Sequence, residues 1–264
     1  MAGLLAIDVG NTQTALGLYE DGELARHWRL ATESQRTGDE LRLLLGGLVD
    51  LTALDGISLA CVVPVLVRAY EELASDVEAP LLVVGPGTRI GIPLRHDAPR
   101  EIGPDRIANA VAAVDRYGAP CIVVDFGTST NFDVVSAEGE YVGGVLAPGI
   151  EVSMDALFAR AARLLKVDFV EPPSPIGKTT ATALQSGLVY GFAGQVDGIV
   201  GKVREELGRD AQVVATGGLA ELIAAHAKTI ERVDAFLTLE GLRLIWERNA
   251  SWLGSRYRDH EGKR

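Results

Sequence analysis

The chain has 264 residues, 47% of them hydrophobic, and a formal net charge of −11 at pH 7. This length suits one large domain or two of about 120 residues, and so acidic a chain is not expected to bind nucleic acid or an anionic membrane surface. The N-terminus lacks a basic leader, no apolar run approaches ~20 residues, and both cysteines lie in apolar strand-like runs, so we expect a cytoplasmic protein.

The first predicted element is a β-meander, and it occurs twice. The segment Leu4–Leu24 returns 117 residues later as Cys121–Tyr141, and the two copies align without a gap, so that Asp8 corresponds to Asp125. Each copy has an apolar run ending in aspartate, a turn of small residues, an apolar-rich return strand and a glycine turn into a third strand. Two independent turns have no reason to agree in motif and in hairpin length, so the chain is predicted to be two halves of one design.

Helices and strands alternate between the two copies. Thr37 and Glu40 form a capping box that opens a helix with the sequence LRLLLGGLVD. The strand ISLACVV follows, then a helix that begins near Pro64, the strand LLVV, and a helix at Asp105–Tyr117 that ends at Gly118. This order predicts an α/β fold in which helices pack against a mixed sheet.

The second copy is followed by a long helix, a proline-rich loop, a helix at Thr180–Leu207, a further βα unit and a closing helix at Leu239–Trp252. Because the repeat divides the chain, we place one domain at residues 1–118 and a second at residues 119–253. A polar tail at residues 254–264 is expected to be disordered.

Each meander places a carboxylate at the end of a buried strand, Asp8 in the first copy and Asp125 in the second. A turn of small residues with free backbone N–H groups follows each carboxylate, which is an arrangement that holds a metal-bound phosphate. The first turn, at Gly10–Gln13, lacks the Gly-Lys-Ser/Thr ending of a P-loop, so we expect Mg²⁺ at Asp8, bound directly or through water. An aspartate before such a turn often only bonds its own backbone, but two copies at one offset argue against that interpretation.

A second candidate element, Gly103–Arg106, puts an acid and an arginine at a predicted helix start. Capping and the helix dipole favour Asp105 at such a position for purely structural reasons. Alternatively, Asp105 accepts the proton of an alcohol during phosphoryl transfer, and Arg106 binds an anionic end of the substrate. The residues by themselves leave both interpretations open. The pair Gly217-Gly218 is a weaker signal for close approach of a nucleotide to the backbone.

Taken together, these motifs resemble those of one family, the type III pantothenate kinases, over about residues 3–252. This family belongs to the superfamily of acetate and sugar kinases, heat-shock ATPases and actin. The motifs that carry the resemblance are DVGNT at Asp8–Thr12, G-x-D-R at Gly103–Arg106, DFGTST at Asp125–Thr130, GG-x₃-PG at Gly143–Gly149, IGKTT-x₅-SG at Ile176–Gly187 and LTLEGLRLIWERN at Leu237–Asn249.

The resemblance implies an actin-like ATPase fold of two ribonuclease-H-like domains, each a mixed sheet that starts with a β-meander and has flanking helices. It implies ATP-dependent phosphorylation of pantothenate to 4′-phosphopantothenate, the first step of coenzyme A biosynthesis, by a homodimer with its substrate site near the interface. Asp105 corresponds to the catalytic base and Asp125 to the ligand of a monovalent cation, K⁺ or NH₄⁺. The residues that correspond to the ATP site are Asp8, Val9, Gly10, Asn11, Thr12, Gln13, Thr14, Ala15 and Thr128. Those that correspond to the pantothenate site are His96, Gly103, Pro104, Asp105, Arg106 and Thr180.

Three positions depart from the family pattern. Pro104 stands where the family usually has alanine, and proline is tolerated in the first turn of a helix, so no loss is expected there. His96 replaces a tyrosine at the substrate pocket, with an imidazole that still stacks and donates. Thr179 replaces an asparagine, which removes one polar contact expected at the dimer interface.

Two alternative functions remain at this stage. One is a non-catalytic regulator that resembles the Bvg accessory factors, and loss of the base or of a strand-end aspartate would favour it. The other is a kinase for another small hydroxylated substrate of the same superfamily, which would share the two turns but not the G-x-D-R element.

Overall fold

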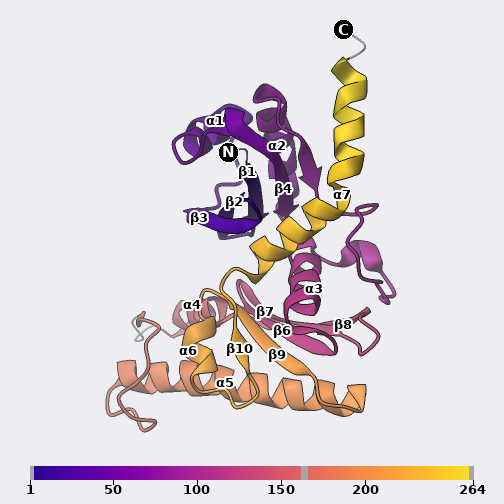
Figure 1. Cartoon of the computed structure of the whole chain (residues 1–264). Coiled ribbons are helices and arrows are strands. Elements are labelled where there is room, and N and C mark those ends of the chain that lie inside the picture. Colours follow the sequence, from indigo (N-terminus) through magenta and orange to yellow (C-terminus); the bar gives the residue numbers. More distant parts are fainter. Residues whose placement is uncertain (1–2, 162–165, 262–264) are drawn as a thin grey trace. The chain divides into compact units, whose positions relative to one another are not determined.

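The computed structural model describes residues 3–161 and 166–261, and its cartoon is shown in Figure 1. The chain divides into two compact units, each with its own β-sheet. The first unit consists of Met1–Ile92, Asp97–Ala112 and Leu237–Arg264, and the second consists of Pro93–His96 and Ala113–Phe236. No helix in the described part of the chain is long and apolar enough to cross a membrane.

The sheet of the first unit has the strand order β3-β2-β1-β4-β5. Its first three strands form the predicted antiparallel meander, and β4 and β5 then add in parallel on the other side of β1. The strands are β1 (Gly3–Val9), β2 (Gln13–Glu20), β3 (Glu23–Ala31), β4 (Leu54–Cys61) and β5 (Leu81–Val83).

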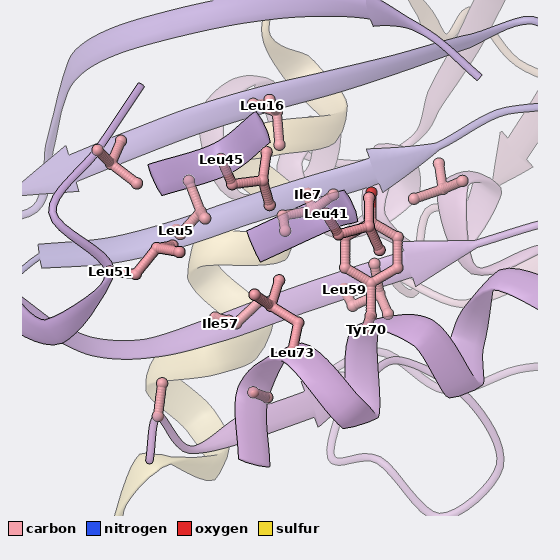
Figure 2. Close-up of a cluster of buried hydrophobic side chains, with 14 of the residues drawn as sticks. Leu5, Ile7, Leu16, Leu41, Leu45, Leu51, Ile57, Leu59, Tyr70 and Leu73 are labelled. Carbon is pink, nitrogen blue, oxygen red and sulfur yellow. The ribbon is translucent and has the colours of Figure 1, made fainter. Parts of the chain in front are cut away.

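One face of this sheet is covered by α1 (Gly38–Gly46) and α2 (Pro64–Asp76). The predicted capping box begins α1: the Thr37 side chain accepts from Glu40 N, and Glu40 Oε2 accepts from Thr37 N at 2.9 Å. Figure 2 shows the core between sheet and helices, whose members include Leu5, Ile7, Leu16, Leu41, Leu45, Ile57, Leu59, Tyr70 and Leu73. Alternate residues of β1 and β4 supply it, as expected for strands with one face on a core.

Small residues line the opposite face of this sheet and allow α7 (Leu237–Glu261) to pack closely. A side chain at Gly56 would overlap the Trp246 ring of α7, and Ser58 Oγ donates to the backbone oxygen of Leu242 at 2.9 Å. A side chain at Gly241 of α7 would overlap the Ala108 backbone of α3 (Pro104–Tyr117). The early part of α3 is therefore held against α7 by direct backbone approach.

The sheet of the second unit repeats this plan with the order β10-β9-β6-β7-β8. Its strands are β6 (Cys121–Phe126), β7 (Ser129–Val135), β8 (Tyr141–Pro148), β9 (Gln212–Gly217) and β10 (Arg232–Val233). Ile122, Val124 and Phe132 face a core that includes residues of α4 (Ile150–Arg160), α5 (Thr180–Leu207) and α6 (Ala220–Ala224). The prediction of two related α/β domains, each opened by a meander, is confirmed.

Three details differ from the sequence analysis. The closing helix, α7, belongs to the first unit and not to residues 119–253, because it packs on β1 and β4; it also continues to Glu261, into the segment predicted as a disordered tail. The remaining tail residues, 262–264, lie outside the described residues. The unit boundary in α3 falls between Ala112 and Ala113, before the predicted boundary at 118.

The gapless alignment of the two copies is also wrong by one residue along β2 and β7. Asp8 pairs with Ala15, seven residues on, whereas Asp125 pairs with Asn131, six residues on. The turn after β1 is thus one residue longer than the turn after β6. The next turn compensates, since Glu20 pairs with Glu23 in the first copy, while Ser136 N donates to Glu140 O in the second.

Candidate active site

The first turn is a closed loop between β1 and β2. Gly10 N donates to the Gln13 oxygen at 3.0 Å, and a Cβ on Gly10 would lie 2.9 Å from that oxygen, so the turn closes tightly around a glycine. Thr32 of the next segment fixes the turn from behind, by donating its N–H to Thr12 O at 3.0 Å and sharing a hydroxyl hydrogen bond of 2.8 Å with Thr14. Asn11, Thr12 and Gln13 are exposed at its tip, and Asp8 is half-buried at its base.

The second turn joins β6 and β7 and is supported by Gly149, the last glycine of the GG-x₃-PG motif. Gly127 N donates to Ser129 O at 3.1 Å, and Gly149 N donates to Thr128 O at 3.2 Å. A side chain at Gly149 would overlap the Thr128 oxygen. Gly149 therefore holds the backbone of Thr128, the residue that the sequence analysis predicts to contact ATP.

Asp125 lies between two oxygen-bearing side chains at the same level of the sheet. The register places Asn131 of β7 on one side and Thr216 of β9 on the other, and both are buried. Gly217 has φ +94°, and a Cβ there would lie 2.8 Å from Asp125 Oδ1 and 2.6 Å from the Phe126 oxygen. The absence of a side chain at this position leaves room for the carboxylate. The sequence analysis missed Asn131 and Thr216, since only the strand pairing brings them beside Asp125.

Asp105 lies in the first turn of α3, which begins at Pro104, one residue before the predicted start. A side chain on Gly103 would overlap Asp105 Oδ1, so glycine is required for the carboxylate to fold back against the backbone. Oδ1 is buried and has no hydrogen-bond partner among the residues that the structure describes. Within those residues this oxygen makes none of the capping bonds that a purely structural aspartate would make.

The electrostatic surroundings of Asp105 suit a proton acceptor. Burial raises the pKa of its carboxyl above the ordinary value of 3.8, and the backbone N–H and positive charge of neighbouring Arg106 partly oppose that rise. A raised pKa makes a carboxylate a better proton acceptor.

His96 lies in a short segment of the second unit that adds to the edge of β8. Arg95 N donates to Tyr141 O at 2.8 Å, and Tyr141 N donates to Pro93 O at 2.9 Å. The Arg95 side chain also forms an ion pair with Glu140 at 2.9 Å. The His96 ring lies 6.4 Å from the Tyr141 ring, centroid to centroid. The sequence analysis gave no sign of this pairing, because Pro93–His96 and Tyr141 are far apart in the chain.

Thr179 and Thr180 lie at the start of α5. Thr179 is the N-cap: its hydroxyl accepts from Thr182 N at 3.1 Å, and Thr182 Oγ1 accepts from Thr179 N at 3.1 Å. Threonine is a good capping residue, so Thr179 has a structural role at this helix start. Thr180, the next residue, is exposed.

The family model for type III pantothenate kinase matches residues 4–202. A relative with that name from Acidothermus cellulolyticus is 52% identical over 252 residues, covering 93% of this chain and 98% of that protein. Another, from Moorella thermoacetica, is 51% identical over 252 residues, covering 93% of this chain and 99% of that protein. The chain belongs to the type III pantothenate kinase family.

Solved structures support the fold of this family member. A Baf-family protein from Campylobacter jejuni matches with a TM-score of 0.61 and 18% identity, covering 94% of this chain and 99% of that chain. Component A of (R)-2-hydroxyglutaryl-CoA dehydratase from Acidaminococcus fermentans matches with a TM-score of 0.54 and 12% identity, covering 96% of this chain and 100% of that chain. At these identities the likeness shows the actin-like ATPase fold alone. The regulatory and other-substrate alternatives are not favoured, because the family match covers most of the chain.

The predicted site residues of this pantothenate kinase fall in both units. The first unit carries the turn at residues 8–15 together with Gly103–Arg106, and the second carries His96, Asp125, Thr128 and Thr180. Two further residues, Asp133 and Tyr141, form a buried polar pair beside His96 that the sequence analysis missed. The available signal was an acidic residue between Phe132 and Val134 in the second strand of the second copy.

Proposed function

We propose that this chain transfers the γ-phosphoryl group of ATP to the 4′-hydroxyl of pantothenate. The observation that carries the proposal is the Asp105 carboxylate, which has an unpartnered buried oxygen among the described residues, at the helix start of a chain that matches a kinase family. Asp105 accepts the hydroxyl proton as the hydroxyl oxygen attacks, and Arg106 binds the pantothenate carboxylate through paired N–H donors.

The two glycine turns bind the nucleotide. The backbone N–H groups of residues 10–13 and the Thr128 region are donors for phosphate oxygens, and Asp8, Val9, Thr14 and Ala15 frame the first turn. Phosphoryl transfer depends mainly on positioning and on neutralising charge on the transferred group, so rigid turns suit it. The bonds from Thr32 and Gly149 hold these turns in shape before the nucleotide arrives.

The residues present fit the two cations expected from the sequence, Mg²⁺ at Asp8 and K⁺ or NH₄⁺ at Asp125. The described residues contain no group of three or more His, Cys, Asp or Glu side chains that would form a complete metal cage. A single strand-end carboxylate such as Asp8, combined with nucleotide phosphates, is how Mg²⁺ is commonly held. Because position 217 is a glycine, there is space beside the Asp125 carboxylate that a side chain would fill. The neighbouring residues Asn131 and Thr216 carry oxygen atoms, which are the ligands that K⁺ or NH₄⁺ prefers. When bound, these cations offset the negative charge of the phosphates.

The deciding experiment measures ADP release from ATP and Mg²⁺ with and without pantothenate. We expect release only when pantothenate is present, together with formation of a phosphorylated product. ADP release that is independent of pantothenate, or that another hydroxylated substrate supports better, would contradict the proposal.

The proposed cation site predicts a choice among monovalent salts. At matched ionic strength, K⁺ and NH₄⁺ should support turnover, and Na⁺ alone should not. Asp125→Asn should remove this difference. Equal wild-type rates in the three salts would take the cation out of the mechanism.

The proposed quaternary state is a two-fold dimer in which Thr180 of one chain completes the pantothenate site of the other. Its support is the family resemblance and the exposure of Thr180 at the start of α5. Mixing an Asp105→Asn chain with a Thr180→Arg chain, each inactive alone, should restore activity, because one of the two heterodimer sites is free of both changes. A monomer by light scattering, or no recovery in proven heterodimers, would rule out the shared site.

A further inference from the structure

A buried tyrosine–aspartate pair lies in the sheet of the second unit. The Tyr141 hydroxyl donates to Asp133 Oδ1 at 2.9 Å, and both residues are 0% exposed. Burying a carboxylate is costly even when it is hydrogen-bonded, so a fully buried aspartate needs an explanation beyond packing.

The first unit shows that the fold itself does not require this pair. By strand register, Asp133 opposite Val123 corresponds to Gly17 opposite Ala6. In the second unit, Tyr141 pairs with Val135, the last residue of β7. In the first unit, Leu24 pairs with Tyr19 near the end of β2, so Leu24 corresponds to Tyr141.

In the first unit a leucine covers a glycine at these positions: a Cβ on Gly17 would lie 2.9 Å from Leu24 Cδ1. The same architecture is therefore stable with an apolar contact at this place. The polar pair is a special feature of the second unit.

What distinguishes Tyr141 from Leu24 is the segment that carries His96. Tyr141 exchanges backbone hydrogen bonds with Pro93 and Arg95, and its ring lies against the His96 ring at 46°. A Cβ on Gly143 would lie 4.0 Å from His96 Cδ2, and Gly143 has φ +127°. The imidazole therefore has the Tyr141 ring and the Gly143 backbone as neighbours.

We propose that Asp133 and Tyr141 are positioning residues that fix the orientation of His96 for binding of the hydroxylated acid substrate. This inference rests on the proposed function, since it assigns His96 to the pantothenate site. The hydrogen bond to Asp133 locks the Tyr141 ring, and the locked ring limits the orientations open to His96. Side chains that are held in their binding geometry lose less entropy when substrate arrives, so the pair contributes to affinity and not to the chemical step.

The first test is Tyr141→Phe, which removes the hydroxyl and keeps the ring. We expect KM for pantothenate to rise about threefold to tenfold, the effect of one lost hydrogen bond, with kcat and KM for ATP nearly unchanged. A purely structural role would lower the melting temperature and the active fraction, and KM would stay the same. Unchanged KM in a folded Tyr141→Phe enzyme would overturn the proposal.

Tyr117→Phe is a matched control. The Tyr117 hydroxyl donates to Asp234 Oδ2 at 2.9 Å in the same unit, so this variant removes the same kind of bond at the same length. No ring contact between Tyr117 and His96 is found in the described part of the chain. We expect KM for pantothenate to stay at the wild-type value in this variant.

A double-mutant cycle tests whether the effect passes through His96. In a His96→Ala background, Tyr141→Phe should raise KM no further, because the side chain it positions is gone. An equal rise in both backgrounds would show that Tyr141 acts by another route. Asp133→Asn supplies a second variant: its amide oxygen still accepts from Tyr141, so KM should stay close to wild type, whereas Asp133→Leu should reproduce the rise seen in Tyr141→Phe.

A readout without turnover separates this inference from the proposed function. The imidazole resonances of His96, assigned with His96→Gln, should shift and broaden in substrate-free Tyr141→Phe and stay unchanged in Tyr117→Phe. If the wild type phosphorylates pantothenate but these resonances do not respond, the positioning role fails while the proposed function stands. If the resonances respond but the wild type does not use pantothenate, the proposed function fails, and only the effect of Tyr141 on the orientation of His96 stands.

Discussion

Cys61 in the first unit and Gly217 in the second occupy the same place in their sheets, opposite Val9 and Phe126. The first unit carries a half-buried side chain there, whereas the second has a glycine with φ +94° whose Cβ would lie 2.8 Å from Asp125 Oδ1. The strand order is shared, but the space around the strand-end carboxylate is not. The repeat therefore predicts the shared architecture of the two units. Differences at single positions, such as Cys61 against Gly217, give the two strand-end carboxylates different surroundings.

The largest expected effect tests whether the chemical step belongs to the first unit. Asp105→Asn should lower kcat about 10²–10⁴-fold, because the hydroxyl proton loses its acceptor. The control is Asp115→Asn, an exposed position on the same helix, which should keep kcat near wild type. Steady-state kinetics on the folded variants checks both, and a near-normal kcat for Asp105→Asn would show that another group is the base.

The next prediction contrasts the two equivalent positions beside the strand-end carboxylates. Gly217→Ala should destabilise the second unit by about 2–4 kcal/mol, through an unfavourable φ and overlap with the Phe126 oxygen. Cys61→Ala, at the matching place, should cost about 1 kcal/mol or less. Thermal unfolding measures both losses of stability. Similar small losses in the two variants would mean that position 217 tolerates a side chain as well as position 61 does.

A smaller effect compares the capping boxes of the two units. Thr37→Ala at α1 and Thr179→Ala at α5 should each cost about 1 kcal/mol, because each threonine hydroxyl accepts a backbone N–H of the first helical turn. Amide hydrogen exchange in the first turn of each helix should speed up locally in the corresponding variant. Faster exchange at both helices from either single change would show that the two caps are coupled.

The last prediction concerns the pH dependence of stability at Asp105. Because its pKa is raised in the folded protein, ionised Asp105 opposes folding at neutral pH, and this penalty disappears as the pH falls through the raised pKa toward the ordinary value of 3.8. Asp105→Asn should therefore melt slightly above wild type at pH 7, with the difference shrinking in acid. A difference that grows as the pH falls would mean that the pKa is lowered instead.

Several features could be predicted from the sequence because their causes are local. Thr37 with Glu40 and Pro104 after Gly103 fix helix starts through neighbouring backbone groups, and α5 begins at Thr180 and ends at Leu207 as expected. The duplicated Asp-x-Gly pattern at residues 8–10 and 125–127 identified both strand-end carboxylates, since it lies within a few residues of each one.

The candidate site was only partly predictable. Asp8, Asp105 and Asp125 each belong to a short motif, and so do the glycines that shape their surroundings at positions 103 and 149. Asn131, Thr216 and Tyr141 have no such signal, because each reaches the site only through pairing with another strand.

The sequence by itself determined the duplicated α/β architecture, the family and the carboxylates, because repeats, caps and turns act over a few residues. Tertiary structure alone decided that α7 completes the first unit, that Pro93–His96 pairs with β8, and that Asp133 takes the place of Gly17. Each of these depends on which distant backbones meet. A one-residue difference in a turn moves every later side chain to the other face of a strand, and a gapless alignment conceals that change.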